Sequence, residues 1–309
     1  MRAEQILKTG PPGVIQSVEL PQPTPKSGEV IVRVKAAGVG PWDALIREGK
    51  TALKIYPPII LGADVAGTVE AIGEGVTGFE KGEEVYGSTN SNFIGAYAEF
   101  AVCSAKMIAR KPKTINFIEA GAAPVVAVTA WQMIHDYAHA KAGQTVLIHG
   151  AAGSVGACAV QLAKLAQLKI IATASAGDAD YVRSLGAEKV LDYRGARFED
   201  SIAPVDIVLD LVGGETQERS FRVLRPGGIL VSVVEPIPEG TEKKYGVKAV
   251  FFYVEVTTER LNTLTKLFDS GELHVEVGTV LPLNQAPKAH EMLAGAPHKR
   301  GKIVLELSA

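Results

Sequence analysis

The sequence predicts an α/β protein with a doubly wound parallel-sheet domain inserted into a mostly β domain. Three observations support this. The chain has 309 residues, which at roughly 150 residues per domain suggests two domains. Residues 14–102 hold short β-rich runs separated by glycine and proline, whereas residues 144–234 alternate apolar strands with helices. The β-rich pattern then returns after Gly271.

The composition is that of a soluble globular protein, with 47% hydrophobic and 21% charged residues. A net charge of -2 argues against nucleic acid as the main partner, because phosphate binding needs a surplus of Lys and Arg. Residues 1–7 have no apolar stretch typical of a signal peptide, and no window reaches the roughly 20 apolar residues of a membrane span. We therefore expect a cytoplasmic protein.

The first third is expected to form short strands. Val30, Val32 and Val34 alternate with polar or long side chains, as in a half-buried strand. Residues 21–28 carry proline at every second position and are expected to form a loop, because proline cannot feed a sheet ladder. The strands expected in this part span residues 14–20, 29–34, 59–72, 83–86 and 97–102.

The pattern changes near Pro124. Residues 125–139 contain no glycine or proline and predict a helix. The strands that follow are nearly continuous apolar runs, which is typical of a parallel sheet covered on both faces. Strands are expected at 144–149, 169–174, 205–212, 228–234, 247–256, 275–281 and 303–307, and helices at 155–166, 180–185, 216–224, 259–269 and 286–293. The predicted domains are 1–124 with 271–309, and 125–270.

A glycine-rich loop is the strongest local signal. The apolar run Val146-Leu147-Ile148 leads into Gly150, Gly153 and Gly156, and an apolar helix begins directly after. Such glycines let backbone N–H groups approach a pyrophosphate at the positive end of the helix. The spacing is G-x-x-G-x-x-G, not the usual G-x-G-x-x-G, so a plain glycine-rich turn is the alternative. The position between strand and helix favours a dinucleotide site.

The end of the second strand bears on the choice of cofactor. An NAD-binding unit usually has an acidic residue there for the ribose 2′-hydroxyl, whereas this chain has Ser175. A small hydroxyl leaves room for a 2′-phosphate and favours NADPH over NADH. No Arg or Lys follows within residues 176–180, so the positive partner would come from elsewhere, such as Tyr193-Arg194. The alternative is that Ser175 only caps the next helix.

The sequence gives little reason to expect a metal. His135 and His139 share a helix face, but no H-E-x-x-H glutamate or third ligand accompanies them. The two cysteines, Cys103 and Cys158, are too few for a four-thiolate zinc site and are expected to be buried small hydrophobes.

Several motifs in order resemble the medium-chain dehydrogenase/reductase superfamily, in its zinc-independent quinone oxidoreductase (zeta-crystallin-like) branch. The resemblance covers essentially the whole chain. Besides the glycine loop, the matching stretches are Ala37-Gly38-Val39-Gly40-Pro41-Trp42-Asp43, Leu61-Gly62-Ala63-Asp64-Val65-Ala66-Gly67-Thr68-Val69, Gly95-Ala96-Tyr97-Ala98-Glu99-Phe100, Ala127-Val128-Thr129-Ala130-Trp131, Leu185-Gly186-Ala187, Asp210-Leu211-Val212-Gly213-Gly214 and Gly301-Lys302-Ile303-Val304-Leu305.

The resemblance implies a GroES-like β domain beside a Rossmann domain, and a reductase without zinc. The zinc-dependent relatives carry Cys in the Val39-Gly40 stretch and His-Glu at Ala63-Asp64, and they have a four-cysteine lobe that this chain lacks. Two departures from the branch concern the cofactor. Gly40 stands where many relatives have Asn, and the Lys that often follows the second strand is replaced or deleted near Gly177-Asp178.

The family also implies hydride transfer from nicotinamide to a quinone or an α,β-unsaturated carbonyl. Without zinc, the developing negative oxygen needs hydrogen-bond donors or water. Tyr56 and Tyr97 are the candidate catalytic residues, and Trp42, Asp43 and Tyr253 the candidate cleft residues, although core packing is an equal explanation for each aromatic side chain. The residues expected to bind NADPH are Thr129, Gly150, Ala152, Gly153, Ser154, Val155, Ser175, Tyr193, Val212 and Lys302.

Two other functions fit the same sequence. One is an enoyl-thioester reductase of a biosynthetic pathway. The other is a non-catalytic NADPH-binding protein, with a structural or redox-sensing role. Turnover of a quinone, as opposed to cofactor binding without turnover, separates the catalytic functions from the last one.

The run Val247 to Val256 suggests how the chain assembles. It is β-rich and aromatic, with Phe251 and Tyr253 on one face and Phe252 and Val254 on the other. As the outermost strand of the sheet it would leave unpaired N–H and C=O groups. The family resemblance implies that this edge pairs with its two-fold mate in a homodimer. Alternatively the run is an internal strand, or residues 236–245 cover the edge.

Overall fold

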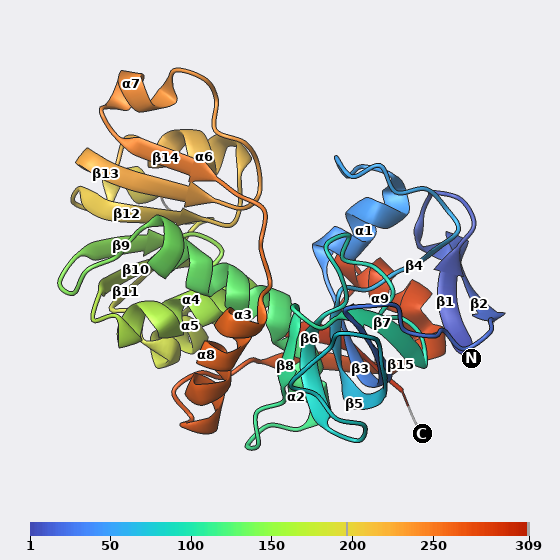
Figure 1. Cartoon of the computed structure of the whole chain (residues 1–309). Coiled ribbons are helices and arrows are strands. Elements are labelled where there is room, and N and C mark those ends of the chain that lie inside the picture. Colours follow the sequence, from blue (N-terminus) through green and yellow to red (C-terminus); the bar gives the residue numbers. More distant parts are fainter. Residues whose placement is uncertain (196, 308–309) are drawn as a thin grey trace. The chain divides into compact units, whose positions relative to one another are not determined.

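The computed structural model describes residues 1–195 and 197–307. It divides into two compact units, one formed by Met1–Val125 with the chain from Val256 onward, the other by Val126–Glu255 (Figure 1). The chain therefore leaves the first unit, builds the second and returns.

The first unit contains a seven-stranded sheet in the order β15-β16-β3-β5-β6-β8, with β7 also paired to β3. Its central strand, β3 (Glu29–Val39), is antiparallel to both β5 (Asp64–Ile72) and β16 (Lys302–Glu306). The end of the chain thus completes a sheet begun near its start. The other strands are β6 (Glu84–Ser88), β7 (Phe100–Ser104), β8 (Ile108–Arg110) and β15 (Val277–Pro282).

A small sheet and several helices complete this unit. The sheet has the order β2-β1-β4, formed by β1 (Arg2–Ile6), β2 (Ile15–Glu19) and β4 (Ile59–Ile60). The α-helices are α1 (Pro41–Glu48), α2 (Phe117–Ala122), α8 (Thr258–Asp269) and α9 (Ala286–Leu293). Helix α1 starts directly after β3 because Gly40 and Asp43 form its N-terminal cap, with the Gly40 N–H donating to the Asp43 carboxylate.

The boundary near residue 270 differs from the expected one, because α8 belongs to the first unit. Tyr86 on β6 donates a hydrogen bond to the carbonyl of Leu261 at 2.9 Å, and the Thr258 hydroxyl donates to the carbonyl of Ile108 at 2.7 Å. Leu261, Leu264 and Phe268 are the buried residues of α8. Local helix periodicity could not show which sheet this apolar face would cover.

The second unit is a six-stranded parallel sheet in the order β11-β10-β9-β12-β13-β14 (Figure 1). Its strands are β9 (Thr145–Ile148), β10 (Lys169–Ala174), β11 (Lys189–Asp192), β12 (Val205–Asp210), β13 (Leu224–Ser232) and β14 (Lys248–Phe251). The order reverses between β9 and β12. Ligands of open parallel sheets bind at such a switch point, beyond the carboxyl ends of the strands.

Right-handed crossovers place the helices of the two halves on opposite faces of this sheet. Helices α4 (Ser154–Leu165) and α5 (Ala179–Leu185) connect β9, β10 and β11, whereas α6 (Gly214–Ser220) and α7 (Thr241–Tyr245) connect β12, β13 and β14. The expected doubly wound α/β fold is confirmed. Cys103 and Cys158 are both buried, as predicted.

Two predicted elements are shorter or less regular than expected. The helix predicted over 125–139 is an α-helix at α3 (Pro124–Trp131) that widens into a π-helix over Gln132–Tyr137. The β-rich run 247–256 is a strand only over Lys248–Phe251. Short elements such as α1, α2, β8 and β11 have too few residues for periodicity to reveal them.

Strand β14 is the outermost strand of its sheet, and α7 covers part of its free edge. The N–H groups of Val247 and Ala249 donate to Glu242, one to its backbone carbonyl at 3.2 Å and one to its side chain at 3.0 Å. By alternation, the N–H of Phe251 is the next to point outward. Phe251 and Tyr253 contact each other edge to face, while Phe252 is buried and stacks on Tyr137.

In the part of the chain that the structure describes, no helix has both the length and the apolar character needed to span a bilayer.

The homodimer remains a prediction, and this geometry refines its test. Phe252→Lys is unsuitable, because a charge at a buried, stacked ring would destabilise the fold whether or not a dimer forms. Phe251→Lys changes a half-buried ring beside the outward edge. We expect the wild type to sediment as a dimer at micromolar concentration and Phe251→Lys to dissociate at least about tenfold more readily. A monomeric wild type would contradict the prediction.

Candidate functional site

The glycine loop lies at the switch point of the second unit's sheet. It leaves β9, passes Gly150 and enters α4 at Gly153, whose backbone is extended and whose lack of a side chain leaves the helix start uncapped. Gly150 has a φ of +65°, and a Cβ there would lie 3.5 Å from Leu211 and Val212 side-chain atoms at the end of β12. Glycine is thus favoured by the left-handed backbone, whereas the neighbouring residues would meet a Cβ only at ordinary contact distance.

The first helical bond at this end runs from the Ala157 N–H to the Gly153 carbonyl at 2.8 Å. By helix geometry, the N–H groups of Ser154, Val155 and Gly156 therefore have no acceptor within the helix. They point along an axis whose N-terminal end carries partial positive charge. The loop is suited to hold the pyrophosphate of a dinucleotide, so the residues present fit a dinucleotide cofactor.

Gly156 makes the closest contact in the loop. A Cβ at this position would lie 2.3 Å from the carbonyl oxygen of Gly150 and 2.7 Å from the Cα of Ala151. Both are backbone atoms, which cannot move aside as a side chain would. Gly156 therefore sets how near α4 comes to β9, and indirectly where the helix N-terminus points.

Asp210 shapes the facing loop, although the sequence analysis assigned it no role. Its side chain is completely buried at the end of β12. One oxygen accepts the N–H groups of Val212 and Gly213, and the other accepts the Gln217 amide and the Ser232 hydroxyl at 3.2 and 2.9 Å. These bonds fix the turn that exposes half of the Val212 side chain beside Gly150.

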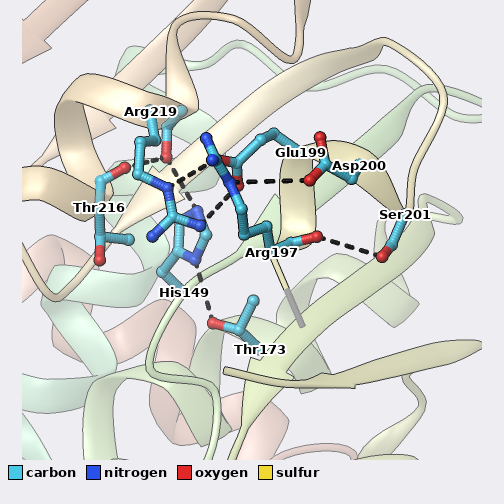
Figure 2. Close-up of polar contacts among 9 residues, drawn as sticks. His149, Thr173, Arg197, Glu199, Asp200, Ser201, Thr216 and Arg219 are labelled. Carbon is cyan, nitrogen blue, oxygen red and sulfur yellow. Dashed lines mark hydrogen bonds and ion pairs between the residues drawn. The ribbon is translucent and has the colours of Figure 1, made fainter. Parts of the chain in front are cut away.

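His149 ties the glycine loop to the strands and to α6 (Figure 2). It is buried directly before Gly150, with its Nδ1 3.0 Å from the Thr173 hydroxyl and its Nε2 2.9 Å from the Ser220 hydroxyl. The Ser220 hydroxyl donates its proton to the Thr216 carbonyl, so it can only accept from the imidazole. His149 is therefore the Nε2–H tautomer, and Thr173 donates to Nδ1.

An ion pair lies beside this histidine (Figure 2). Arg219 donates two hydrogen bonds to Glu199, at 2.8 and 2.6 Å, and Arg197 also contacts Glu199. The Arg219 hydrogen bonds are the main reason that the pKa of Glu199 is lowered to about 2. Burial is the main reason that the pKa of His149 is lowered to about 4; Arg219 acts in the same direction, whereas Asp210 and Glu199 oppose it. His149 is thus neutral at physiological pH.

Ser175 follows β10, as predicted, but its surroundings differ from the expectation. Its hydroxyl donates to the carboxylate of Asp178 at 2.6 Å and makes no side-chain cap bond to the backbone. Asp178 therefore brings negative charge to the carboxyl end of β10, where the sequence analysis placed none. Tyr193 follows β11 and is exposed, with the Arg194 guanidinium 5.3 Å from its ring centre.

A buried ion pair organises the candidate residues of the first unit. Lys302 starts β16, Asp64 starts β5, and their Nζ and Oδ2 atoms lie 2.9 Å apart with side-chain exposures of 7% and 3%. The other oxygen of Asp64 accepts the N–H of Val125 at 2.8 Å. Both residues flank the end of β3, so three chain segments far apart in sequence meet at one point.

A separate chain of polar contacts lies in the core of the same unit. Asp43 is buried and accepts the Gly40 N–H at 2.8 Å and the Tyr97 hydroxyl at 3.1 Å. The Tyr97 hydroxyl also lies 3.4 Å from Nε2 of His290, whose Nδ1 is 2.8 Å from the Arg47 guanidinium. Arg47 can only donate, so His290 accepts at Nδ1 and carries its proton at Nε2. Each group therefore donates to the next: Arg47 to His290, His290 to Tyr97, and Tyr97 to Asp43.

Burial sets the protonation states in this chain. It raises the pKa of Asp43 to about 7, which Gly40 and Lys302 partly oppose and Asp64 reinforces. It also lowers the pKa of His290 to about 3, with Arg47 acting in the same direction. His290 is therefore a neutral hydrogen-bonding group, whereas Asp43 exchanges a proton near neutral pH.

The structure brings together only part of the predicted site. Asp43 and Tyr97 share a hydrogen bond. Trp42, which directly precedes Asp43 in the chain, packs edge to face on Phe93. Tyr97 has no exposed surface, so in this structure it can position Asp43 but cannot touch a substrate. Tyr56 lies apart, with 74% of its surface exposed. In the second unit, Thr129 is buried on α3, and Tyr253 is exposed beyond β14.

Among residues 1–195 and 197–307, no three His, Cys, Asp or Glu side chains come together in a way that could hold a metal ion. His135 and His139, the metal pair considered from sequence, have local contacts instead. The ring of His135 packs on Trp131 at 4.1 Å between centres, and Nδ1 of His139 contacts the carbonyl of His135.

Two family models match the chain. The alcohol dehydrogenase GroES-like domain covers residues 26–113, and a family described as zinc-binding dehydrogenase covers residues 185–305. Among curated proteins, the quinone oxidoreductase of Mus musculus is 31% identical over 99% of this chain and 98% of its own length. The 2-methylene-furan-3-one reductase of Solanum lycopersicum is 33% identical over 81% of this chain and 64% of its length.

Solved structures show the same similarity. The quinone oxidoreductase from Coxiella burnetii is 33% identical, with a TM-score of 0.91 over 100% of this chain and 99% of that one. The Escherichia coli quinone oxidoreductase, solved in complex with NADPH, is 29% identical, with a TM-score of 0.89 over 98% of this chain and 100% of that one. The similarity extends over both units.

Gly156→Val tests the glycine loop. The added side chain would collide with the backbone of Gly150 and Ala151, forcing α4 away from β9 and displacing its N-terminus. We expect cofactor affinity to fall at least about a hundredfold, or about 3 kcal/mol, measured by nicotinamide fluorescence. Gly13→Ala is the control, because a Cβ there has no neighbour within 4 Å. A folded Gly156→Val protein with unchanged affinity would place the cofactor elsewhere.

His149 gives a prediction about pH. The pKa of His149 is about 4 in the folded protein, whereas its ordinary value is 6.5. Between these two pH values the unfolded chain therefore binds the proton more readily than the folded protein does. Stability should fall as the pH drops from about 6.5 to 4, by up to about 3 kcal/mol from this residue. His149→Gln should flatten that loss, measured by urea unfolding, while the same change at exposed His298 should not. Parallel curves for wild type and His149→Gln would contradict it.

Proposed function

The chain belongs to the medium-chain dehydrogenase/reductase superfamily, in its quinone oxidoreductase branch, and from this we propose that it reduces quinones or α,β-unsaturated carbonyls with NADPH. The coarser statement, an oxidoreductase that uses a nicotinamide cofactor, follows from the family. The substrate class and the phosphate on the cofactor are the proposed part.

The glycine loop is the observation that carries the proposal. It combines a left-handed Gly150, an uncapped 12-residue helix α4 and a close contact at Gly156, all at the switch point of a parallel sheet. The residues proposed to hold the cofactor in this unit are Gly150, Ala152, Gly153, Ser154, Val155, Thr129, Ser175, Tyr193 and Val212. When bound, the nicotinamide supplies a hydride, while the chain's residues orient it and keep competing water away.

The first unit is proposed to bind the substrate. Trp42 offers a partly buried aromatic surface next to Asp43. Tyr97 donates a hydrogen bond to Asp43, and the neutral His290 contacts the Tyr97 hydroxyl. Aromatic surfaces suit a planar quinone or enone. The two-electron reduction of such a substrate also takes up one proton, and a carboxyl group with a pKa of about 7 is suited to exchange it with water.

A turnover assay tests the function. Oxidation of NADPH and NADH should be followed by absorbance with a panel of quinones, enones and enoyl thioesters. We expect turnover with at least one quinone or simple enone, unaffected by a chelator. Activity confined to enoyl thioesters would assign the biosynthetic reductase instead. Tight NADPH binding with no turnover across the panel would favour a non-catalytic protein.

NADPH is proposed over NADH because an exposed cation, Arg194, follows β11 and packs on Tyr193. The Escherichia coli relative is complexed with NADPH. Asp178 works against this preference, since its carboxylate lies against Ser175 and would repel a 2′-phosphate.

Two variants test the cofactor preference in opposite directions. Asp178→Asn should raise the ratio of kcat/KM for NADPH over NADH, and Ser175→Asp should lower it, each by about tenfold. Both positions follow β10 and lie outside the glycine loop. A wild type that prefers NADH, with Asp178→Asn abolishing NADH use, would show that Asp178 binds the ribose instead.

A further inference from the structure

The ion pair between Lys302 and Asp64 crosses over the end of β3. Gly38 pairs with Asp64, and Val39 pairs with Ile303, the residue after Lys302. The pair needs a glycine beneath it, because a Cβ at Gly38 would lie 2.9 Å from the Asp64 side chain and 2.5 Å from the Gly121 carbonyl oxygen. The backbone of β3 is therefore shaped to admit these two charges.

Stability alone is a poor reason for such a pair. Removing an ammonium and a carboxylate from water costs several kcal/mol for each ion, and apolar replacements are often as stable. Both oxygens of Asp64 are used, by Lys302 and by the Val125 N–H. Lys302 has three donors, yet Asp64 is its ammonium's one hydrogen-bond or ion-pair partner within the described residues.

Space is available next to the unused donors. A Cβ built on Gly40 would lie 3.2 Å from Nζ of Lys302 and within 4 Å of no other described atom apart from its chain neighbours. Gly40 has φ -142° and ψ 169°, a conformation open to any residue, so its backbone does not demand glycine. The missing side chain leaves room beside the ammonium.

A second unsatisfied group belongs to the same cluster. Oδ1 of Asp43 is buried and has no hydrogen-bond partner, while Oδ2 accepts the Gly40 N–H. Lys302 and Asp64 both act electrostatically on Asp43. When Asp43 is protonated it is neutral. The Lys302 ammonium then faces one charged carboxylate, that of Asp64, and is not drawn into a second ion pair with Asp43.

We propose that the ammonium of Lys302 binds the carbonyl or quinone oxygen of the substrate in the space beside Gly40 and stabilises the negative charge that develops there. Asp64 is its positioning residue. This inference rests on the proposed function and assigns Lys302 to the substrate, whereas the sequence analysis placed it among the cofactor-binding residues.

The chemistry balances without a further reagent. NADPH is oxidised to NADP+ by loss of a hydride, which forms a C–H bond at the electron-poor carbon, and the π electrons of the substrate move onto its oxygen. The ammonium donates a hydrogen bond to that oxygen throughout, which lowers the barrier without being consumed. One proton from water, exchanged through Asp43 or directly, completes the neutral product.

The principal test compares wild type with the double variant Lys302→Met/Asp64→Asn, which removes both charges and leaves neither buried alone. We expect kcat/KM for the quinone or enone to fall about 100- to 1000-fold, while the dissociation constant of NADPH changes less than about threefold. Lys302→Arg keeps the charge with a longer, planar group and should retain part of the activity. If NADPH binding is lost instead, Lys302 holds the cofactor and the proposal is overturned.

Gly40→Ala keeps every charge and fills the space. We expect it to raise KM for the substrate at least about fivefold with an unchanged melting temperature and NADPH affinity, while Gly13→Ala, with equally open surroundings, changes none of these. Unchanged KM and kcat in Gly40→Ala would overturn the proposed position of the substrate oxygen, even if the double variant does not fold.

A binding measurement separates this proposal from the proposed function. 4-Nitrophenol resembles a hydroquinone anion, and its visible absorbance reports ionisation. Bound beside an ammonium it should ionise more readily in the wild type than in Lys302→Met/Asp64→Asn or Gly40→Ala. This result would support the oxygen site even if the turnover panel fails. Equal ionisation in all three proteins would overturn it even if the wild type reduces quinones.

Discussion

The need to pair a buried charge governs both halves of this protein. Asp210 in the second unit and Asp64 in the first are almost completely removed from water, so every oxygen must find a donor. Asp210 finds backbone and side-chain donors from its own loop, α6 and β13, and this fixes the turn that faces the glycine loop. Asp64 finds Lys302 and the start of α3, and this joins three distant segments.

Close backbone approach is the second requirement, and glycine meets it. Gly156 lets α4 reach β9, and Gly38 lets the ion pair cross β3. In each case a Cβ would strike backbone atoms that cannot yield. Gly40 differs, because its backbone is ordinary and its neighbour is an ammonium. The first two glycines are explained by packing, while the third is explained better by what can occupy the space beside it.

The buried histidines show how the scaffold stays rigid without adding charge. His149 and His290 are both kept neutral by burial, and the partners of each ring settle which nitrogen carries the proton. His149 links the glycine loop to β10 and α6, and His290 links Tyr97 to α1. We propose that the charges used in the reaction are those of Lys302, Asp43 and the N-terminus of α4.

The sequence by itself determined the fold class, the insertion of one unit into the other and the glycine loop, because alternating strands and helices and a strand–glycine–helix turn are local patterns. It could not determine that residues 258–269 pack in the first unit, that Asp178 turns toward Ser175, or that Tyr97 is buried behind Asp43. Nor could it join Asp64 to Lys302, which are separated by most of the chain. These facts depend on which sheet a helix covers and which strands become neighbours, and only the tertiary structure decides that.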